Sequence, residues 1–311
     1  AMLTAATLGV FDLLEERPRR AEEFSEKAMD RLLDACVALG LLACEEGVYR
    51  NTPSASRYLT RESPDSMIGY VLYSDRVLYP MWGHLAEAVR EGSHRWKQTF
   101  GLEGPLFDHF FQTDDAMRTF LRGMHGFGRI SSPKVVAAFD LSRYGTFCDL
   151  GGATGHLTVA ACEHYPGMRG IVFDLPRVMP AAREYVATST AGARIECVPG
   201  DFFTDALPEA DVYAVGRILH DWSEEKIPVL LGKIFAALPA GGALLIAEKI
   251  LGPVSAHMQS LNMLICTEGR ERTLEQYEAL LRAAGFAEVQ GLITGAPVDA
   301  ILARKAGGNQ G

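Results

Sequence analysis

The sequence predicts a two-part α/β protein, with a mainly helical region over residues 1–140 and a Rossmann-like domain over residues 141–311. A chain of 311 residues is long enough for two domains. Up to residue 140 the apolar residues recur at helical spacing. From residue 143 short β-rich runs alternate with helical ones, which is typical of βαβ units and predicts a mostly parallel sheet with helices on both faces.

Composition and charge exclude several classes of function. Hydrophobic residues make up 48% and charged residues 22%, as in ordinary globular proteins, and the formal net charge is −9. Nucleic acids and anionic membranes both require a cationic surface, so we expect neither partner. Six scattered cysteines without a C-x-x-C pair predict neither a zinc site nor disulfides. No apolar run approaches a membrane span, and we expect a cytoplasmic protein.

The N-terminal region begins with short helices that a small β-ribbon closes. Leu32, Cys36 and Leu39 lie at three- and four-residue steps, and residues 47–52 follow as a strand-like run. This order is similar to a winged helix. Because the region is acidic, protein–protein contact is favoured over DNA binding, and a transcription factor is a weak alternative.

Residues 66–140 are predicted to continue as helices, with an aromatic-rich stretch. Two interpretations stay open for these side chains, a helix core or the wall of a flat aromatic-binding pocket. The stretch contains Phe107, Phe110, Phe111, Phe120, Met124 and Phe127.

The C-terminal region contains five predicted parallel strands, at residues 146–150, 170–173, 194–198, 211–215 and 243–247. A capping box, Thr273 with Gln276, announces a last helix that stops at Gly285. Two final strands are expected near residues 287–293 and 298–303.

Every predicted parallel strand is followed by glycine or a polar residue. Open α/β sheets bind ligands outside the carboxyl ends of their strands, so this pattern predicts a binding cleft. The residues are Asp149 with Gly151, Gly152 and Gly155, then Asp174, then Gly200, Asp201 and Phe202, then Arg217, His220 and Asp221, and lastly Glu248.

The first of these turns distinguishes between cofactors. Its glycines give G-G-x-x-G, whereas an NAD fingerprint needs G-x-G-x-x-G. From Asp149 onward the turn is close to the acidic-Gly-x-Gly-x-Gly turn of S-adenosylmethionine (SAM) enzymes, where small residues admit an amino-acid tail. Asp174 is placed to accept the ribose hydroxyls, or alternatively to cap a helix. Asp201 and Phe202 would then meet the adenine.

These motifs resemble the SAM-dependent O-methyltransferases of the acetylserotonin/caffeate type. The matching segments are DLGGATG at 149–155, FDLP at 173–176, GDFF at 200–203, HDW at 220–222, SLNML at 260–264 and GRERT at 269–273. The likeness extends to residues 82–85 and 298–304.

The resemblance implies SAM as methyl donor, and homodimers whose winged-helix domains interlock over the partner's active site. It implies that His220 is the general base and that Glu271 and Glu248 hold its imidazole. The implied cofactor-binding residues are Asp149, Gly151, Gly152, Gly155, Asp174, Gly200, Asp201, Phe202 and Arg217. The expected substrate contacts are Asp221, Asn262, Met263, Cys266, Phe107, Phe120 and Met124.

Each catalytic assignment has a simpler alternative. His220 is read alternatively as a capping or core histidine, Glu248 as an exposed strand end, and Glu271 as a surface salt bridge to the arginines beside it. No cluster of oxygen ligands is evident beside His220, so we expect metal-free catalysis. A non-catalytic SAM-binding protein and an NAD-dependent oxidoreductase are weaker alternatives.

Four positions depart from relatives of the acetylserotonin type. Phe111 stands where vertebrate enzymes have Tyr, Gly128 where they have a cofactor-contacting Trp, and Cys266 where they have a substrate-contacting Gln. We therefore expect another small aromatic acceptor, such as an indole, a phenazine or a polyketide phenol, with N-acetylserotonin as the alternative. Ala153 replaces a usual Gly, which should cost little if its φ is negative.

Overall fold

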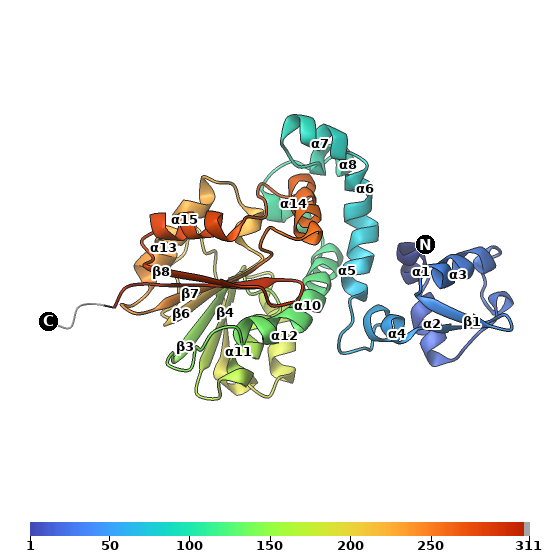
Figure 1. Ribbon diagram of the computed structural model, residues 1–311, viewed down its shortest axis with the longest axis horizontal. Coiled ribbons are helices and arrows are strands. Elements are labelled where there is room, and N and C mark those ends of the chain that lie inside the picture. The colour runs from blue at the N-terminus through green and yellow to red at the C-terminus, as the bar shows by residue number, and fades with distance from the viewer. Residues whose placement is uncertain (308–311) are drawn as a thin grey trace. The chain divides into compact units, whose positions relative to one another are not determined.

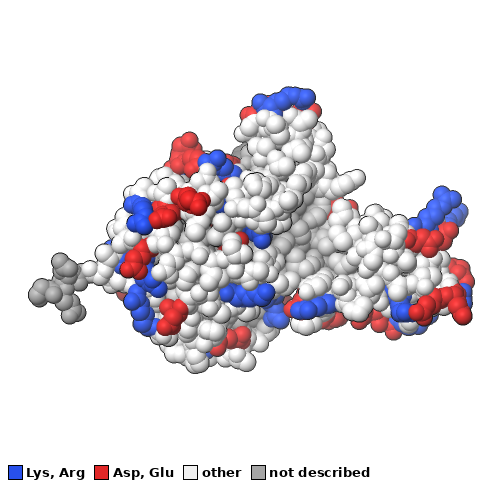
Figure 2. All heavy atoms as spheres, viewed as in Figure 1, with Lys and Arg blue, Asp and Glu red and all other residues white. Residues whose placement is uncertain are grey.

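The computed structural model describes residues 1–307 and divides the chain into two compact units (Figure 1). One unit contains Ala1–Gly83 and Phe110–Phe127, and the other contains His84–His109 and the chain from Gly128 onward. Among the described residues, no helix is both long and apolar enough to cross a membrane. Basic and acidic side chains are interspersed on the face drawn in Figure 2.

The first unit opens with the helices and the β-ribbon that the sequence predicts. The elements are α1 (Met2–Thr7), α2 (Val10–Glu16), α3 (Met29–Ala38), β1 (Leu42–Glu45), β2 (Val48–Asn51) and α4 (Pro53–Leu59). β1 and β2 pair antiparallel through a tight turn in which Glu46 and Gly47 both have positive φ, 50° and 75°. Phe11, Leu33 and Leu42 pack together beneath the ribbon as part of its core.

The remainder of this region is helical, as expected. The elements are α5 (Ile68–Tyr73), the π-helical turn η2 (Ser74–Leu78), α6 (Tyr79–Trp82), α7 (Leu85–Glu91), α8 (Trp96–Phe100), α9 (Leu106–Phe110) and α10 (Asp114–Val136). A Cβ at Gly69 would lie 2.8 Å from the Arg122 backbone, so α5 and α10 approach closely. The Phe120 ring packs against Tyr73 and Phe110, with centroid distances of 5.6 and 4.8 Å.

The second unit is built on a seven-stranded sheet with the order β5-β4-β3-β6-β7-β9-β8. The strands are β3 (Thr146–Leu150), β4 (Arg169–Asp174), β5 (Ile195–Pro199), β6 (Val212–Gly216), β7 (Ala243–Glu248), β8 (Glu288–Leu292) and β9 (Asp299–Arg304). β3 to β7 pair in parallel, and β8 and β9 add an antiparallel edge. The predicted Rossmann-like fold is confirmed.

Helices cover both faces of this sheet. They are α11 (His156–His164), α12 (Met179–Thr188), α13 (Lys226–Ala237) and α15 (Leu274–Ala283), whereas α14 (Val254–Cys266) packs against α7. In Figure 1, α11 and α12 lie on one side of the sheet and α13 and α15 on the other. Every residue of β7 is buried, as two-sided coverage requires. The predicted capping box of Thr273 and Gln276 starts α15.

The strand order reverses at β3, which lies between β4 and β6. From β3 the chain proceeds outward to β4 and β5, then returns to the opposite side for β6 and β7. Open α/β sheets bind ligands outside the carboxyl ends of the strands at such a reversal, which makes this edge of the sheet the candidate site. The turn of residues 151–155 lies at this point.

The condition under which Ala153 should cost little, a negative φ, is not met. Its φ is +51°, in the left-handed region, between Gly151 at +69° and Gly155 at +81°. The Ala153 N–H donates a hydrogen bond to Asp174 Oδ2 at 2.8 Å, and this bond holds the unfavourable conformation. A left-handed residue other than glycine costs about 1–2 kcal/mol.

Ala153→Gly should therefore raise the free energy of unfolding, by about 1 kcal/mol, because it relieves this strain. Urea unfolding followed by circular dichroism measures the change. Ala160→Gly, in the middle of α11, is the matched control and should lower stability by about 1 kcal/mol. Equal losses in the two variants would contradict the strain assigned to Ala153.

Candidate active site

The turn after β3 requires glycine for both conformation and space. Gly151 and Gly155 have positive φ, and a Cβ at Gly151 would lie 2.5 Å from Ile218 Cδ1. At Gly155 a Cβ would lie 2.9 Å from Val172. The Gly151 N–H donates to the Phe173 carbonyl at 2.8 Å, which ties the turn to β4. The turn therefore presents backbone, rather than side chains, to whatever binds at this edge of the sheet.

Two carboxylates lie at this turn. Asp149 is 2% exposed, and burial together with the charge of Asp174 raises its pKa to about 8. Burial raises the pKa of Asp174 to about 6, against the lowering effect of N–H bonds from Ala153 and Leu175. A ligand with hydroxyl or ammonium donors would stabilise the charged form of these buried carboxylates. A ribose diol supplies hydroxyl donors, and an amino-acid tail supplies an ammonium donor.

The segment after β5 lies next to the same turn. The Gly200 N–H donates to the Asp174 carbonyl at 2.9 Å, and a Cβ at Gly200 would lie 2.4 Å from the Phe173 ring. Asp201 Oδ1 accepts the Phe203 N–H at 2.8 Å. Phe202 Cε1 lies 3.3 Å from the position of a Cβ on Gly151. The structure thus gathers these predicted cofactor residues at one edge of the sheet, where they fit a nucleoside carrying an amino-acid tail.

Arg217 follows β6 in a strained conformation. Its φ is +59°, and its N–H donates to the Ala247 carbonyl of β7 at 3.0 Å. Its positive charge lowers the pKa of Asp221, although burial dominates and raises that pKa to about 6. Non-glycine residues with such φ values cluster at functional sites. Arg217 directly precedes Ile218, whose side chain lies next to Gly151, and the His220 segment follows.

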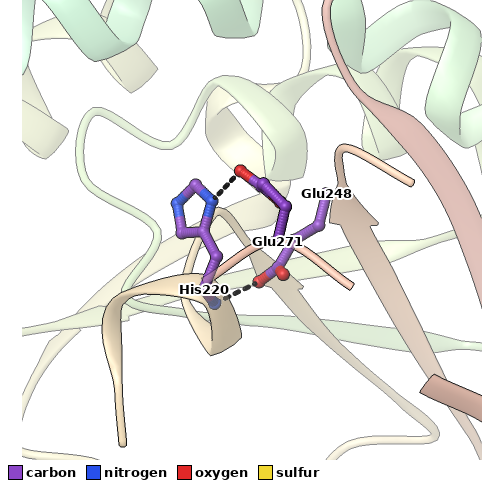
Figure 3. A group of neighbouring side chains, drawn as sticks. All are labelled: His220, Glu248 and Glu271. Carbon is purple, nitrogen blue, oxygen red and sulfur yellow. Dashed lines mark hydrogen bonds and ion pairs between the residues drawn. The ribbon is translucent and has the colours of Figure 1, made fainter. Parts of the chain in front are cut away.

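His220 lies in a 3₁₀ turn, η4 (Leu219–Asp221), and is 3% exposed. Its Nδ1 lies 2.7 Å from Glu271 Oε1 (Figure 3). Its Nε2 lies 3.7 Å from Asp221 Oδ1. The carboxylate at Nδ1 favours a proton on that nitrogen in the neutral ring. Nε2 then carries the lone pair that is able to accept a proton.

The electrostatics of His220 favour the protonated ring. Burial lowers its pKa, but the charges of Glu271 and Asp221 outweigh burial and raise the pKa to about 9. This raised pKa stabilises the imidazolium form of the ring. A cation that binds beside the ring lowers this pKa, so that the ring loses its proton and is able to act as a base.

Glu248 stabilises the backbone of this turn. Its Oε1 accepts the N–H groups of Ile218, Leu219 and His220 at 3.0, 2.5 and 3.3 Å. Its Oε2 accepts the Tyr277 hydroxyl. Glu248 thus binds the backbone of the turn, and its charge also raises the pKa of the His220 ring. Its predicted part in holding the imidazole stays a prediction. Glu248 is fully buried, which excludes the exposed strand end.

Glu271 contacts His220 because its neighbouring arginines pair elsewhere. Arg270 and Arg272 bind Glu224, at 3.1 and 2.9 Å. Glu271 is 1% exposed, which excludes a surface salt bridge. A Cβ at Gly269 would lie 2.4 Å from the His220 carbonyl oxygen, so only glycine lets this segment pass so close to the turn.

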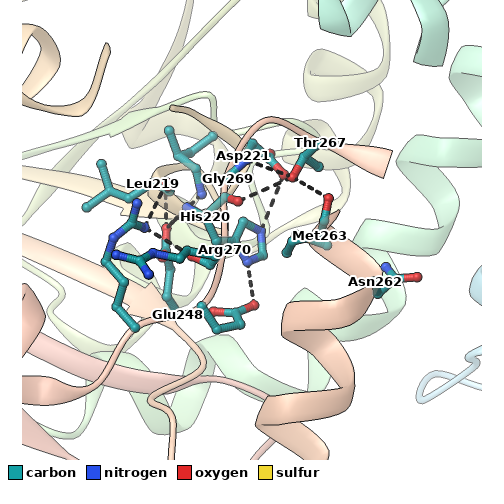
Figure 4. Close-up of polar contacts among 12 residues, drawn as sticks. Leu219, His220, Asp221, Glu248, Asn262, Met263, Thr267, Gly269 and Arg270 are labelled. Carbon is teal, nitrogen blue, oxygen red and sulfur yellow. Dashed lines mark hydrogen bonds and ion pairs between the residues drawn. The ribbon is translucent and has the colours of Figure 1, made fainter. Parts of the chain in front are cut away.

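The end of α14 is joined to the His220 turn (Figure 4). The Glu268 N–H donates to the Asp221 carbonyl at 3.1 Å, and the Thr267 hydroxyl lies 3.5 Å from the His220 carbonyl. Cys266 Sγ donates to the Asn262 carbonyl at 2.9 Å. The expected substrate residues Asn262, Met263 and Cys266 therefore stand on the helix that adjoins the base.

The aromatic residues expected at the substrate divide between the two units. Phe107 packs against Trp222, beside the His220 turn, with ring centroids 5.4 Å apart. Phe120 and Met124 lie on the part of α10 that belongs to the first unit. Their contact with a substrate stays a prediction.

Several positioning residues were missed by the sequence reasoning. Tyr277, on α15, donates its hydroxyl to Glu248. Arg272 Nη1 donates to the Leu219 carbonyl at 3.3 Å, and Trp96 Nε1 donates to the Cys266 carbonyl at 2.8 Å. These bonds join residues far apart in the chain, and no local pattern indicates them.

The three central side chains also form a set of metal-ligand type. One ligand atom each of His220, Glu248 and Glu271 lies within 4.8 Å of the others. The expectation that no cluster of oxygen ligands lies beside His220 is therefore wrong as to geometry. Glu248 already accepts four donors, and Glu271 Oε1 is engaged by Nδ1. A cation would have to displace these bonds, so metal-free catalysis remains our expectation.

Comparisons with known proteins agree with this geometry. Residues 82–287 match the model of the O-methyltransferase domain, and residues 1–61 match that of the O-methyltransferase dimerisation domain. Acetylserotonin O-methyltransferase of Bos taurus is 42% identical over 98% of this chain and 93% of its own length.

Two solved structures extend the likeness. Human N-acetylserotonin methyltransferase in complex with SAM has a TM-score of 0.93 at 40% identity, covering 98% of this chain and 93% of its own. The mitomycin 7-O-methyltransferase MmcR has a TM-score of 0.86 at 28% identity, with the same coverage. With family models matched over both its regions and relatives at about 40% identity along its length, this chain belongs to the O-methyltransferase family.

Proposed function

We propose that this SAM-dependent O-methyltransferase methylates a hydroxyl group of a small planar aromatic metabolite, with His220 as the general base. The observation that carries the proposal is the buried contact of 2.7 Å between His220 Nδ1 and Glu271, which leaves Nε2 to take a proton. Phe107 and Trp222 beside the base supply flat apolar surface for an aromatic ring.

In the proposed arrangement, different residues bind different parts of SAM. SAM supplies an electrophilic methyl carbon on a sulfonium cation. In the proposed arrangement Asp174 accepts the ribose hydroxyls, and Asp201 and Phe202 receive the adenine. The turn of residues 151–155 takes the amino-acid tail. These contacts hold the methyl carbon in line with the acceptor oxygen. Such positioning lowers the activation barrier by roughly 7–11 kcal/mol in well-oriented reactions.

Proton removal falls to His220. A phenol has a pKa near ~10 and an ordinary imidazole near ~6.5, a gap of roughly 4.8 kcal/mol against full transfer. The neighbouring carboxylates raise the His220 pKa to about 9 and so narrow this gap. The Glu271 carboxylate stabilises the imidazolium as Nε2 takes the proton, concerted with methyl transfer.

We propose the chemical class of the acceptor rather than one compound. N-acetylserotonin is the second candidate, favoured by the identity of 42% to the bovine enzyme. Phe111, Gly128 and Cys266, which depart from the vertebrate pattern, favour a different aromatic alcohol. We also propose a cytoplasmic homodimer, supported by the match to the dimerisation domain.

Methyl transfer from isotope-labelled SAM tests the proposal directly. The acceptors are N-acetylserotonin, caffeate, hydroxyphenazines and polyketide phenols, with the products identified by mass. Label on an aromatic oxygen supports the proposal and ranks the two candidates. Bound SAM without label in any product would indicate a non-catalytic SAM protein.

His220→Ala should lower kcat by about 10² to 10⁴-fold, because the base is lost, while the Kd for SAM stays nearly unchanged. Steady-state kinetics and calorimetry measure the two quantities. His257→Ala, at an exposed histidine of α14, is the matched control and should keep full turnover. Full turnover in His220→Ala would place the base elsewhere.

The rate should depend on pH through His220. Because only the neutral ring accepts a proton and its pKa is raised, kcat/KM should increase with pH through an acidic limb above 6.5. Glu271→Gln removes the main stabilising charge and should move this limb to lower pH. If kcat/KM falls at the same acidic pH in both proteins, Glu271 does not affect the pKa of His220.

Metal removal should leave the rate unchanged. Dialysis against EDTA, followed by assay with and without added Mg²⁺, checks this expectation. Activity that is lost on dialysis and restored by the cation would assign the His220, Glu248 and Glu271 group to a metal.

A further inference from the structure

His220 and Glu271 come from separate loops of the second unit. His220 lies in η4, which follows β6, whereas Glu271 lies between α14 and α15. The two residues are 51 positions apart in the chain, and their side chains meet at 2.7 Å. This contact therefore depends on how the two loops are held against each other.

The side chain of Arg272, the residue after Glu271, joins the two loops. It is 1% exposed. Its Nη1 donates to the Leu219 carbonyl at 3.3 Å and to the Arg270 carbonyl at 3.0 Å. These are the residues that directly precede His220 and Glu271. One nitrogen atom thus binds the backbone next to each of the two partners.

The rest of Arg272 is fixed as well. Its Nη2 donates to Glu224 Oε1 at 2.9 Å, just before α13. Its backbone pairs with Ile250 in an isolated parallel β-bridge just beyond β7, and its carbonyl accepts the Leu251 N–H at 2.8 Å. Because a guanidinium presents its N–H groups in a rigid planar fork, these bonds fix the orientation of the side chain. Arg272 therefore reaches the η4 turn from a backbone that is tied to the sheet.

We propose that Arg272 is a positioning residue that keeps His220 and Glu271 in contact, by binding the Leu219 carbonyl from a backbone tied to the end of β7. The inference rests on the proposed function, in which His220 is the base. The role of Arg272 is geometric, because its guanidinium binds the loops that carry the two partners.

Two possible effects of Arg272 on the His220 ring have opposite signs. Burial lowers the pKa of the ring, and the surrounding carboxylates raise it. Loss of a nearby cation alone would raise this pKa further, whereas loss of the positioning contact would lower it, because Glu271 would move away from Nδ1. The titratable groups that face the ring or the guanidinium are Glu271, Asp221, Glu248, Glu224 and Tyr277.

Arg272→Gln tests this role through kinetics and through the ring itself. We expect kcat to fall by roughly 10- to 100-fold, as displacement of a reacting group predicts, while the acceptor KM and the Kd for SAM stay nearly unchanged. The pKa of His220, followed by ¹⁵N nuclear magnetic resonance, should fall. Arg270→Gln is the matched control. It removes a guanidinium that binds the same Glu224 carboxylate, at 3.1 Å, from an exposed position, and should change none of these quantities.

A second variant retains the positive charge. Arg272→Lys should lower kcat and the His220 pKa less than Arg272→Gln, because a single flexible ammonium holds the Leu219 carbonyl less rigidly than the guanidinium fork. Melting curves confirm folding in each variant. In the His220→Ala background, Arg272→Gln should add no further loss of kcat, because no base is left to position. A further loss there would mean that Arg272 only supports the fold.

Two other results would overturn the inference. One is a kcat in Arg272→Gln equal to that of Arg270→Gln. The other is a His220 pKa that rises or stays the same in Arg272→Gln. The ring titration needs no methyl transfer, so it decides the inference even where the methylation assay of the wild-type protein overturns the proposed function.

Discussion

The site depends on one buried contact, the pair formed by His220 Nδ1 and Glu271. An imidazole and a carboxylate this far from water persist only if the groups around them are also satisfied. Glu248 meets that condition by accepting three backbone N–H groups of the turn and the Tyr277 hydroxyl. The arginines beside Glu271 bind Glu224, which leaves Glu271 for the ring. The base is thus one part of a polar network that spans β6, β7 and α15.

The sheet brings this network to the cofactor residues. Because β3 lies between β4 and β6, the glycine turn, Asp174 and the His220 turn all leave the sheet at the same edge. Strain accumulates there, with Ala153 and Arg217 in left-handed conformations that hydrogen bonds to neighbouring strands maintain. Family membership shows a SAM-dependent O-methyltransferase, and the predicted cofactor residues and the His220 turn lie at the same edge of the sheet.

Local patterns in the sequence predicted the fold well. The five parallel strands, the antiparallel pair and the Thr273 capping box lie where alternation and spacing place them, because each depends on a few adjacent residues. The gathering of polar residues at the carboxyl ends of the strands also followed from the parallel topology. The sequence could not reveal the sign of φ at Ala153, the acceptors of Glu248 or the close approach at Gly269. Each is decided by atoms tens of residues away.

The most direct measurement of the central claim is the titration of the His220 ring by ¹⁵N nuclear magnetic resonance, in the wild-type protein and in Glu271→Gln. We expect a neutral ring protonated at Nδ1, with a pKa above 6.5 that falls when the carboxylate is replaced. A neutral ring protonated at Nε2, or a pKa that Glu271→Gln does not change, would contradict it.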